Sequence, residues 1–444
     1  MSKPNVLVFV PHDLGDFLPA YGVPVTAPNT ERLAGEGVVC TNHFAVGTVC
    51  SPSRGGLMTG CYPHTTKFMG LVHRGWALDT ENYPTIPMQM RAAGWQTCLF
   101  GGQHEHPDPK KLGYDHVELP GEKGEKNYIE NGVRDAVAWL RSEAAKEKPF
   151  YLSIGSGEVH RFGLKPSGWE RDCYSYPDPA DVAVPPWLPD TPEIRLELSQ
   201  FYGAINHFDR EVGKVLGALD ETGLADNTIV IVTTDHGASF IHGKATVYDG
   251  GTKIACIWRW PQGLPSGRRC GALTSHVDFM STLAELCGFE TPEYQEGQSF
   301  AARLKGDGGG EREYVFAEKN YTNYYDPTRF ARSKNYKYIS KGLQTSIFDF
   351  QIPEMELSHH DFRSHRDVYE FYSNLRCREE FYDIQADPGE LLNLIDDPAF
   401  SAELAKHRAA LNDHLEKTDD PFRHLVNDLD MQADGYPMAR PQRK

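Results

Sequence analysis

The chain has 444 residues, 40% hydrophobic and 24% charged, the composition of a globular protein that can bury a large core without disulfide bridges. Its 45 lysines and arginines stand against 62 aspartates and glutamates, so the formal net charge is −17. This balance argues against nucleic acid as a partner, and an anionic substrate needs a metal ion or a few placed cations.

The start of the chain does not resemble a secretion signal, because the apolar run Val6–Val10 ends at Pro11 and such signals need about 7–15 apolar residues. No stretch approaches the ~20 apolar residues that span a membrane. The nine cysteines are odd in number and form no C-x-x-C pair, as in proteins of a reducing compartment. We therefore expect a cytoplasmic protein without a membrane partner.

Short apolar strands alternate with helices over the first two thirds of the chain. The run Asn5–Val10 is apolar and β-branched, as in a buried parallel strand. This alternation indicates an α/β fold around a mostly parallel sheet. In chain order we predict a strand over 5–10, helices over 30–37 and 87–93, a strand over 96–100, a helix over 131–146, a strand over 149–154, a helix over 193–219, strands over 228–233 and 254–258, and a helix over 278–287.

The pattern changes after about residue 305, where the glycine-rich run Gly306–Gly310 predicts a flexible connection. Beyond it, strand-like pieces follow one another without long helices between them. We therefore predict a larger domain over 1–310 and a C-terminal α+β subdomain over 311–444 with a small antiparallel sheet. The pieces are strands at 314–316, 328–331 and 336–339, a weakly patterned polar segment over 346–377, a helix over 401–416 and a loose tail over 435–444.

Polar side chains follow three of the predicted strands directly. Ligands bind at the carboxyl ends of parallel strands, so these residues are candidates for one site. They are His12 and Asp13 after the first strand, Gln103 and His104 after the strand at 96–100, and Asp235 and His236 after the strand at 228–233.

The most specific motif is Cys50-Ser51-Pro52-Ser53-Arg54, which continues to Leu57-Met58-Thr59-Gly60. Without its context it could be a proline-interrupted loop with a buried thiol. The whole string resembles the sulfatase signature C-x-P-S-R followed by L-x-T-G. In that family the cysteine is oxidised to formylglycine, whose hydrated aldehyde attacks sulfur and later expels sulfate. The resemblance implies that Cys50 is the nucleophile precursor and that a formylglycine-generating or anaerobic maturation enzyme is a partner.

The resemblance also implies a divalent metal beside Cys50, with Asp13, Asp235 and His236 as ligands. The first acidic ligand of the family is replaced by His12, which either binds the metal or orients another ligand. The family usually holds Ca²⁺, but imidazole suits zinc and manganese better, so Mn²⁺, Mg²⁺ and Zn²⁺ stay open. Asp235 is implied as a base beside the nucleophile, although an aspartate after a strand can also be a simple cap.

The segment Gly94–His104 resembles the family pattern G-Y-x-T-x-x-x-G-K-W-H. His104 falls on the histidine that assists breakdown of the sulfated enzyme, and its alternative is a structural role. Gly102 stands where the family has a sulfate-binding lysine. Gln103, or a basic residue from elsewhere, is the candidate to replace that contact.

Three more residues complete the implied site. His160 follows the predicted strand at 149–154 and resembles the histidine that binds sulfate or protonates the leaving group. Lys244, in a segment resembling H-G-K-x-x-x-Y-E-G-G-x-R, would contact the sulfate, and Arg54 would hold the nucleophile and metal by charge-assisted hydrogen bonds. A surface loop histidine and a solvated lysine are the alternatives for His160 and Lys244.

The family resemblance covers nearly the whole chain and implies an alkaline phosphatase-like fold, with a mixed, mostly parallel central sheet sandwiched by helices. The larger domain is then the catalytic one. The segment from Glu379 to Leu394 resembles the family's E-L-Y-D-L-x-x-D-P-x-E-x-x-N-L, which we interpret as structural. This segment and the residues after the first and third strands resemble the heparan N-sulfatase-like branch.

The resemblance implies hydrolysis of a sulfate monoester or sulfamate carried by a small substrate. A phosphonate monoester hydrolase or phosphodiesterase of the same superfamily is the first alternative, because such relatives carry the same Asp-His pair. A non-catalytic binding protein that keeps the fold is the second. Family members often form dimers or tetramers, so a homo-oligomer is possible.

Overall fold

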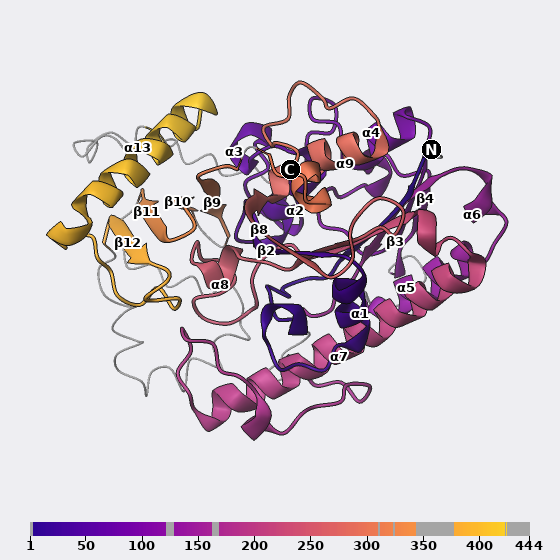
Figure 1. The fold of residues 1–444 in the computed structure, drawn as a ribbon, viewed down its shortest axis with the longest axis horizontal. Helices are drawn as coiled ribbons and strands as arrows, with labels where there is room; N and C mark the ends of the chain where they lie inside the picture. The colour runs from indigo at the N-terminus through magenta and orange to yellow at the C-terminus, as the bar shows by residue number, and fades with distance from the viewer. Residues whose placement is uncertain are drawn as a thin grey trace.

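The computed structural model describes residues 3–120, 128–161, 168–309, 311–322, 325–342, 377–421 and 423. Two sheets organise these residues, a large one built from the first two thirds of the chain and a small one built from the last third (Figure 1). Among the described residues, no helix is both long enough and apolar enough to cross a membrane.

The large sheet has eight strands in the order β4-β3-β5-β1-β6-β7-β2-β8. Neighbouring strands run parallel except β7, which is antiparallel to both β6 and β2. The mixed, mostly parallel sheet predicted from the sequence is therefore confirmed. The strands are β1 Asn5–Val10, β2 Val38–Phe44, β3 Gln96–Gly101, β4 His116–Glu118, β5 Phe150–Gly155, β6 Thr228–Thr233, β7 Cys256–Arg259 and β8 Arg268–Ser275.

Strand β1 lies in the middle of this sheet and is buried along its whole length. Its side chains alternate between two apolar cores, with Leu7 and Phe9 in one and Val6 and Val8 in the other. Because both faces of the strand need apolar residues, the run is continuously hydrophobic. Phe9 packs edge-on against Phe208, with ring centroids 6.3 Å apart.

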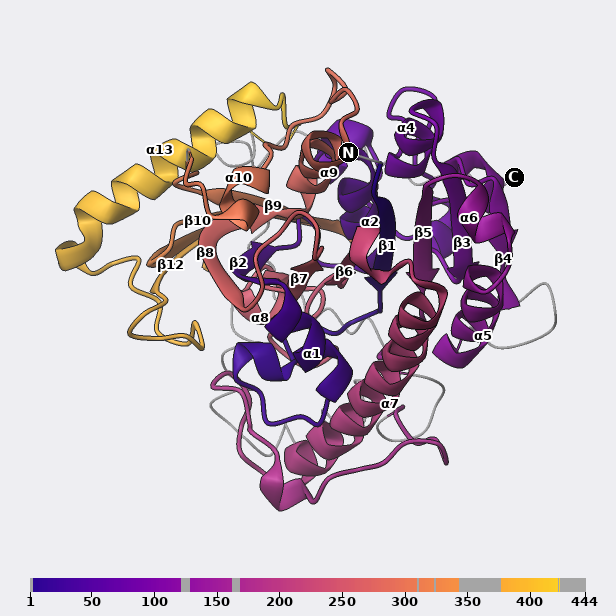
Figure 2. The ribbon, with the colours of Figure 1, turned by 45° about the vertical axis from the view of Figure 1, so that its right-hand side comes forward.

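Helices cover both faces of the large sheet (Figure 2). One face carries α1 (Pro28–Glu36), α5 (Ile129–Leu140) and the long α7 (Pro192–Thr222), where Phe208 lies. The other carries α2 (Cys50–Thr59), α4 (Ile86–Ala92), α9 (Phe279–Cys287) and α10 (Ala301–Lys305). Short helices α3 (Pro63–Thr66), α6 (Ala144–Glu147) and α8 (Asp249–Thr252) lie in the connections.

The small sheet is antiparallel, in the order β12-β11-β10-β9. Its strands are β9 Val315–Tyr321, β10 Tyr325–Arg332, β11 Tyr336–Lys341 and β12 Glu379–Asp383. Helix α13 (Ser401–Lys417) packs its leucines on one face of this sheet. The other face shares an apolar cluster with Phe44 and Leu273 of the large sheet, so the two parts form a continuous core.

Most predicted elements are found within a few residues of their expected bounds. The single helix predicted over 131–146 is wrong in its continuity, because α5 ends at Leu140 and α6 begins at Ala144. The elements that were not predicted include β2, β4, β8, β12 and α2, together with the short helices α3, α8 and α10. The predicted polar segment over 346–377, except for its last residue, and the predicted tail over 435–444 lie outside the described residues, and the domain boundary at residue 310 stays a prediction.

A buried ionic network joins the small sheet and the chain after α13 to the short helix α3 in the first third of the chain. His64 of α3 contacts the carboxylate of Glu318 in β9 and lies 3.4 Å from Asp420. Arg329 of β10 binds Asp420 through two nitrogens, at 2.6 and 3.1 Å. Burial alone would lower the pKa of His64, but the two carboxylates outweigh it and raise that pKa.

This network predicts a pH-dependent contribution of His64 to stability. A raised pKa in the folded state stabilises the fold below the unfolded pKa of about 6.5, and the contribution is lost as pH rises through the folded pKa. We expect His64→Gln to lower the free energy of unfolding by about 2 kcal/mol near pH 6, and by less at alkaline pH. Melting temperatures of both proteins across this range measure the gap. The exposed His73→Gln is the control, and a gap that stays constant or widens with pH contradicts the assignment.

Candidate active site

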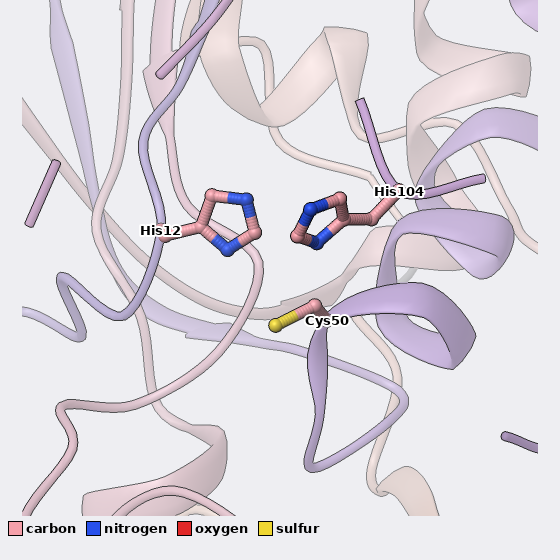
Figure 3. Close-up of side chains that lie close together, drawn as sticks. All are labelled: His12, Cys50 and His104. Carbon is pink, nitrogen blue, oxygen red and sulfur yellow. The ribbon is translucent and has the colours of Figure 1, made fainter. Parts of the chain in front are cut away.

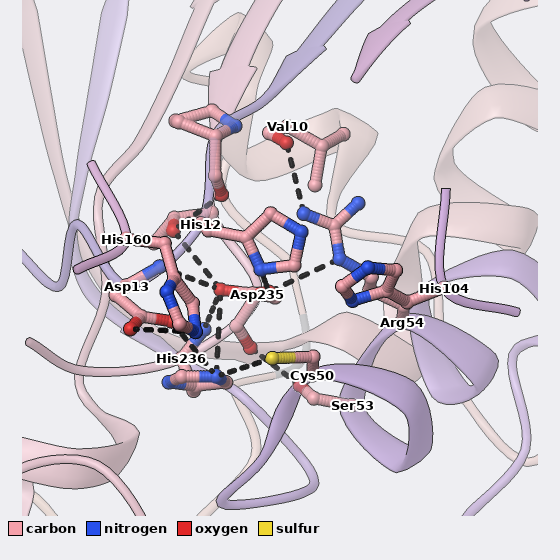
Figure 4. Close-up of polar contacts among 12 residues, drawn as sticks. Val10, His12, Asp13, Cys50, Ser53, Arg54, His104, His160, Asp235 and His236 are labelled. Carbon is pink, nitrogen blue, oxygen red and sulfur yellow. Dashed lines mark hydrogen bonds and ion pairs between the residues drawn. The ribbon is translucent and has the colours of Figure 1, made fainter. Parts of the chain in front are cut away.

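The residues predicted for one site do converge, at the carboxyl ends of β1 and β6 and at the start of α2 (Figure 4). His12 and Asp13 follow β1, and Asp235 and His236 follow β6, the neighbouring parallel strand. Cys50 is the first residue of α2. Adjacent parallel strands therefore bring residues more than 200 positions apart in the chain into contact.

Helix α2 presents Cys50 and Arg54 from one buried face. Positions i and i+4 of a helix are neighbours, so both side chains point to the same place. All ten residues of α2 are buried, which requires close packing on both sides. A Cβ atom on Gly56 would lie 2.3 Å from the Val46 side chain, so only glycine allows this approach.

The carboxylate of Asp235 is fully buried and is the centre of the site. Its Oδ1 accepts hydrogen bonds from the backbone N–H groups of Asp13 at 2.9 Å and His236 at 3.0 Å. Its Oδ2 accepts one from Nε of Arg54 at 3.0 Å and lies 2.9 Å from Nδ1 of His12. Burial alone would raise the pKa of Asp235, but His236, His12 and Arg54 hold it well below its usual range.

Asp13 faces the only lysine predicted for the site. Lys244 Nζ donates to both carboxylate oxygens, at 2.8 and 2.9 Å. Asp13 adopts a left-handed backbone conformation, with φ of 55°, which turns its side chain toward Lys244 and His236. Burial opposes both charges, but their attraction lowers the pKa of Asp13 and raises that of Lys244, so both stay ionised.

Three histidines, His12, His104 and His160, line the site. His12 and His104 lie over Cys50 with ring centroids 4.5 Å apart (Figure 3). Burial, with Arg54 nearby, lowers the pKa of His12 to about 4, and burial lowers that of His104 well below its usual range. His160 contacts the carbonyl oxygen of Arg161 through Nδ1, and its Nε2 is 3.8 Å from Asp13. Its side chain is 31% exposed, which places it at the edge of the site.

Gln103 is held within its own turn. Its Nε2 donates to the carbonyl oxygen of His106 at 2.6 Å, and its Oε1 accepts from the N–H groups of Glu105 and His106. One of the two Nε2 hydrogens is used in this turn, so the predicted sulfate contact of Gln103 would have to come from the other. Its role in substrate binding stays a prediction.

Glu105 is a buried residue of the site that sequence reasoning missed. Its Oε2 accepts from the backbone N–H of His104 at 2.8 Å, and its Oε1 lies 3.8 Å from a guanidinium nitrogen of Arg54. Burial raises the pKa of this carboxyl, and Arg54 opposes the rise. The available signal in the sequence was a charged residue that directly follows the candidate catalytic histidine His104, shortly after the end of a buried strand.

The residues present fit a divalent metal ion. Donor atoms of His12, Asp13, Cys50 and Asp235 all lie within 4.8 Å of one another, and all four residues are buried. Nδ1 of His12 is a buried nitrogen without a well-aligned hydrogen bond, although Asp235 is 2.9 Å away. A cation between such donors would satisfy them together.

Two other groups of potential ligands in the described residues differ from this one. His64, Glu318 and Asp420 lie close together, and Arg329 binds Asp420. In the second group Arg171 forms ion pairs with both Glu130 and Glu158, beside His207. An arginine already neutralises the carboxylates in each, so these are structural networks.

Known proteins resemble this chain over most of its length. The family model Sulfatase matches residues 4–289. An ulvan-active sulfatase of Formosa agariphila is 26% identical, covering 96% of this chain and 78% of that protein. The human N-sulphoglucosamine sulphohydrolase is 25% identical, covering 94% and 91%.

Solved structures show the same fold. A 2-O GAG sulfatase superposes with a TM-score of 0.73 at 24% identity, covering 99% of this chain and 96% of that one. A phosphonate monoester hydrolase of Agrobacterium radiobacter superposes with a TM-score of 0.72 at 19% identity, covering 94% and 96%. With the family model matching well over half of the sequence, the chain belongs to the type I sulfatases of the alkaline phosphatase superfamily and is a sulfuric ester hydrolase.

Proposed function

We propose that this chain hydrolyses a sulfate monoester or sulfamate with a formylglycine made from Cys50. The observation that carries the proposal is the place of Cys50 at the start of α2, with Sγ 3.4 Å from Nε2 of His236 and in one buried group with Asp13 and Asp235. When formed, formylglycine supplies a hydroxyl nucleophile at this position. A formylglycine-generating or anaerobic maturation enzyme is the partner that this chemistry requires.

His12, Asp13, Asp235 and His236 are the residues that would hold the metal, together with the nucleophile. When bound, a divalent ion neutralises charge on a sulfate oxygen and polarises sulfur. Calcium is the usual ion of the family and is our first proposal. Manganese, magnesium and zinc are alternatives, since two of the four protein ligands are imidazoles.

The other groups of the site differ in charge and therefore have different proposed roles. The side chain of Lys244 is 6% exposed, and the amine stays protonated because its pKa is raised. It can bind a sulfate oxygen or the leaving oxygen. His104, with its lowered pKa, is neutral above acidic pH and can accept a proton beside Cys50. His160 lies at the exposed edge, where a leaving group departs, and can bind sulfate or give that group a proton. Asp235 can act as the base beside the nucleophile, and Arg54 holds it ionised.

The relatives support a sulfated saccharide as the substrate class. They include the ulvan-active sulfatase, the N-sulphoglucosamine sulphohydrolase and a Delta 4,5-hexuronate-2-O-sulfatase of Bacteroides thetaiotaomicron that is 27% identical. We propose a small sulfated sugar or sulfamate, in keeping with the cytoplasmic location that we expect. We also propose that the chain belongs to the heparan N-sulfatase-like branch and that it forms a homo-oligomer.

Glu105 has a positioning role in this scheme. Arg54 is buried between two carboxylates, Asp235 at 3.0 Å and Glu105 at 3.8 Å, and its Nη2 also donates to the carbonyl oxygen of Val10. Glu105 in turn binds the backbone of His104. One carboxylate therefore links the arginine that orients Asp235 to the histidine above Cys50.

Conversion of Cys50 is tested by intact-protein mass after co-expression with a maturation enzyme. Formylglycine formation removes one sulfur and two hydrogens and adds one oxygen, and we expect this mass change together with activity on an aryl sulfate. Cys50→Ala should be inactive with an unchanged melting temperature, and Cys173→Ala, at an exposed cysteine, should be fully active. An unmodified, inactive protein would favour a non-catalytic binding role.

The sulfatase and phosphonate hydrolase alternatives are separated by their steady-state kinetics. The second is favoured by the Asp235-His236 pair and by the fold shared with a phosphonate monoester hydrolase. We expect kcat/KM for an aryl sulfate to exceed that for a phenyl phosphonate ester of the same leaving group. A higher kcat/KM for the phosphonate ester rejects our proposal.

Glu105→Gln should lower kcat/KM for the aryl sulfate by about 10-fold, because Arg54 and His104 lose a shared charged acceptor. We expect the acidic limb of the kcat/KM pH profile to shift, since the environment of His104 changes, while KM changes little. Glu31→Gln, at an exposed glutamate of α1, is the matched control. An unchanged pH profile with lowered stability would mean that Glu105 is only structural.

A further inference from the structure

Cys50 lies among donors that suit a metal ion while its side chain is still a thiol. Figure 3 shows Cys50 below the rings of His12 and His104, and Figure 4 shows its Sγ directed toward His236. The donor atoms of His12, Asp13, Cys50 and Asp235 lie within 4.8 Å of one another. These residues therefore surround the sulfur before any oxidation takes place.

Three separations between His236 and its neighbouring donors fall in the range found around a tetrahedral zinc ion. Zinc bonds of about 2.0–2.3 Å place neighbouring ligand atoms roughly 3.2–3.8 Å apart. Nε2 of His236 lies 3.4 Å from Sγ of Cys50, 3.4 Å from Oδ1 of Asp13 and 3.7 Å from Oδ1 of Asp235. An ion of this size can thus be bound with only small movements of the side chains.

The orientation of His236 is set by the backbone beside it. Its Nδ1 lies 2.9 Å from the carbonyl oxygen of Gly237, and because a carbonyl only accepts, Nδ1 donates. The neutral ring then presents the lone pair of Nε2 to Cys50 and the carboxylates. Gly237 is required at this place, since a Cβ atom there would lie 1.8 Å from the carbonyl oxygen of Gly250.

The donor types favour zinc over calcium. Calcium takes 6–8 oxygen ligands, and among the described residues this group offers carboxylates from Asp13 and Asp235 beside a sulfur atom, whereas an oxidised residue 50 would offer oxygen in place of that sulfur. A thiolate, imidazoles and one or two carboxylates are the set that zinc binds in proteins. Arg54 and Lys244 already balance the two aspartates, so a thiolate also supplies part of the negative charge that an added divalent ion needs.

We propose that the unoxidised form of this chain binds zinc through the Cys50 thiolate and three further ligands drawn from His236, His12 and the site aspartates. Binding displaces the thiol proton to solvent and converts Cys50 from a buried thiol into a metal ligand. The metal preference of the site then depends on the state of residue 50, and zinc competes with the maturation enzyme for the sulfur. This inference rests on the proposed function only in assuming that an oxidised form exists.

The test uses the full chain produced without a maturation enzyme, with the thiol confirmed by intact mass. Cobalt(II) serves as the spectroscopic probe for zinc. We expect one equivalent to bind and give a thiolate-to-cobalt absorption band, which zinc abolishes and a large excess of calcium does not. A missing band, or displacement by calcium, overturns the proposal.

Variants assign the band to Cys50. Cys50→Ser and Cys50→Ala should each abolish the absorption band and weaken zinc binding by at least about 100-fold in equilibrium dialysis. His12→Gln should weaken zinc binding by about 10-fold or more. Cys173→Ser, at the exposed cysteine, should keep both. Melting temperatures show that each variant is folded. A band that persists in both Cys50 variants, or that disappears in Cys173→Ser, overturns the proposal.

Activity of the matured protein separates this inference from the proposed function. If matured protein hydrolyses an aryl sulfate and the thiol form binds no zinc, the inference is wrong and the proposed function stands. If the thiol form binds zinc and matured protein does not hydrolyse the ester, the inference stands and the proposed function is wrong.

Discussion

The buried charge of Asp235 is the constraint on which the rest of the site depends. A carboxylate with no exposure stays ionised only if donors replace the water that it loses. Those donors come from three separate segments: the backbone after β1, the backbone after β6 and Arg54 from α2. The two strand ends and the helix are therefore held in one relative position, the position that also brings Cys50 to His236.

The small C-terminal sheet supports the segment that follows Lys244. Asp249, in the short helix α8 that follows the Lys244 segment, is buried between Arg332 of β10 and Lys337 of β11, at 3.0 and 2.8 Å. Lys337 also lies 3.1 Å from Glu390, beyond β12. Burial opposes the charge of Asp249, but the two cations lower its pKa. The C-terminal subdomain thus fixes the backbone between Lys244 and the sheet. Its residues Arg332, Lys337 and Glu390 are all distant from Cys50 in the sequence.

The sequence predicted the fold where each element buries a regular apolar pattern. Strands β1, β3, β5 and β6 and helix α7 fall in this class, and the polar residues after the strands were the candidate ligands that the structure brings together. Strand β2 carries Asn42 and His43, and α2 carries Pro52 and two glycines, so their local propensities oppose the structures that they adopt. Burial in the tertiary structure determines the conformation of both β2 and α2. The Cys50 string was recognisable as a motif, but only packing shows that it is a helix.

The departures from the family pattern are related by charge. His12 replaces a carboxylate, and Gly102 replaces a lysine, so the site loses one negative and one positive group together. The two positions meet in space, because His104, two residues after Gly102, stacks edge-on against His12 at 4.5 Å. A lysine in this turn would bring positive charge close to an imidazole and to the guanidinium of Arg54, which Asp235 and Glu105 already balance. The two departures therefore change the charge of neighbouring positions in opposite directions, and Lys244, which lies 2.9 and 2.8 Å from the carboxylate oxygens of Asp13, keeps a cation in the site.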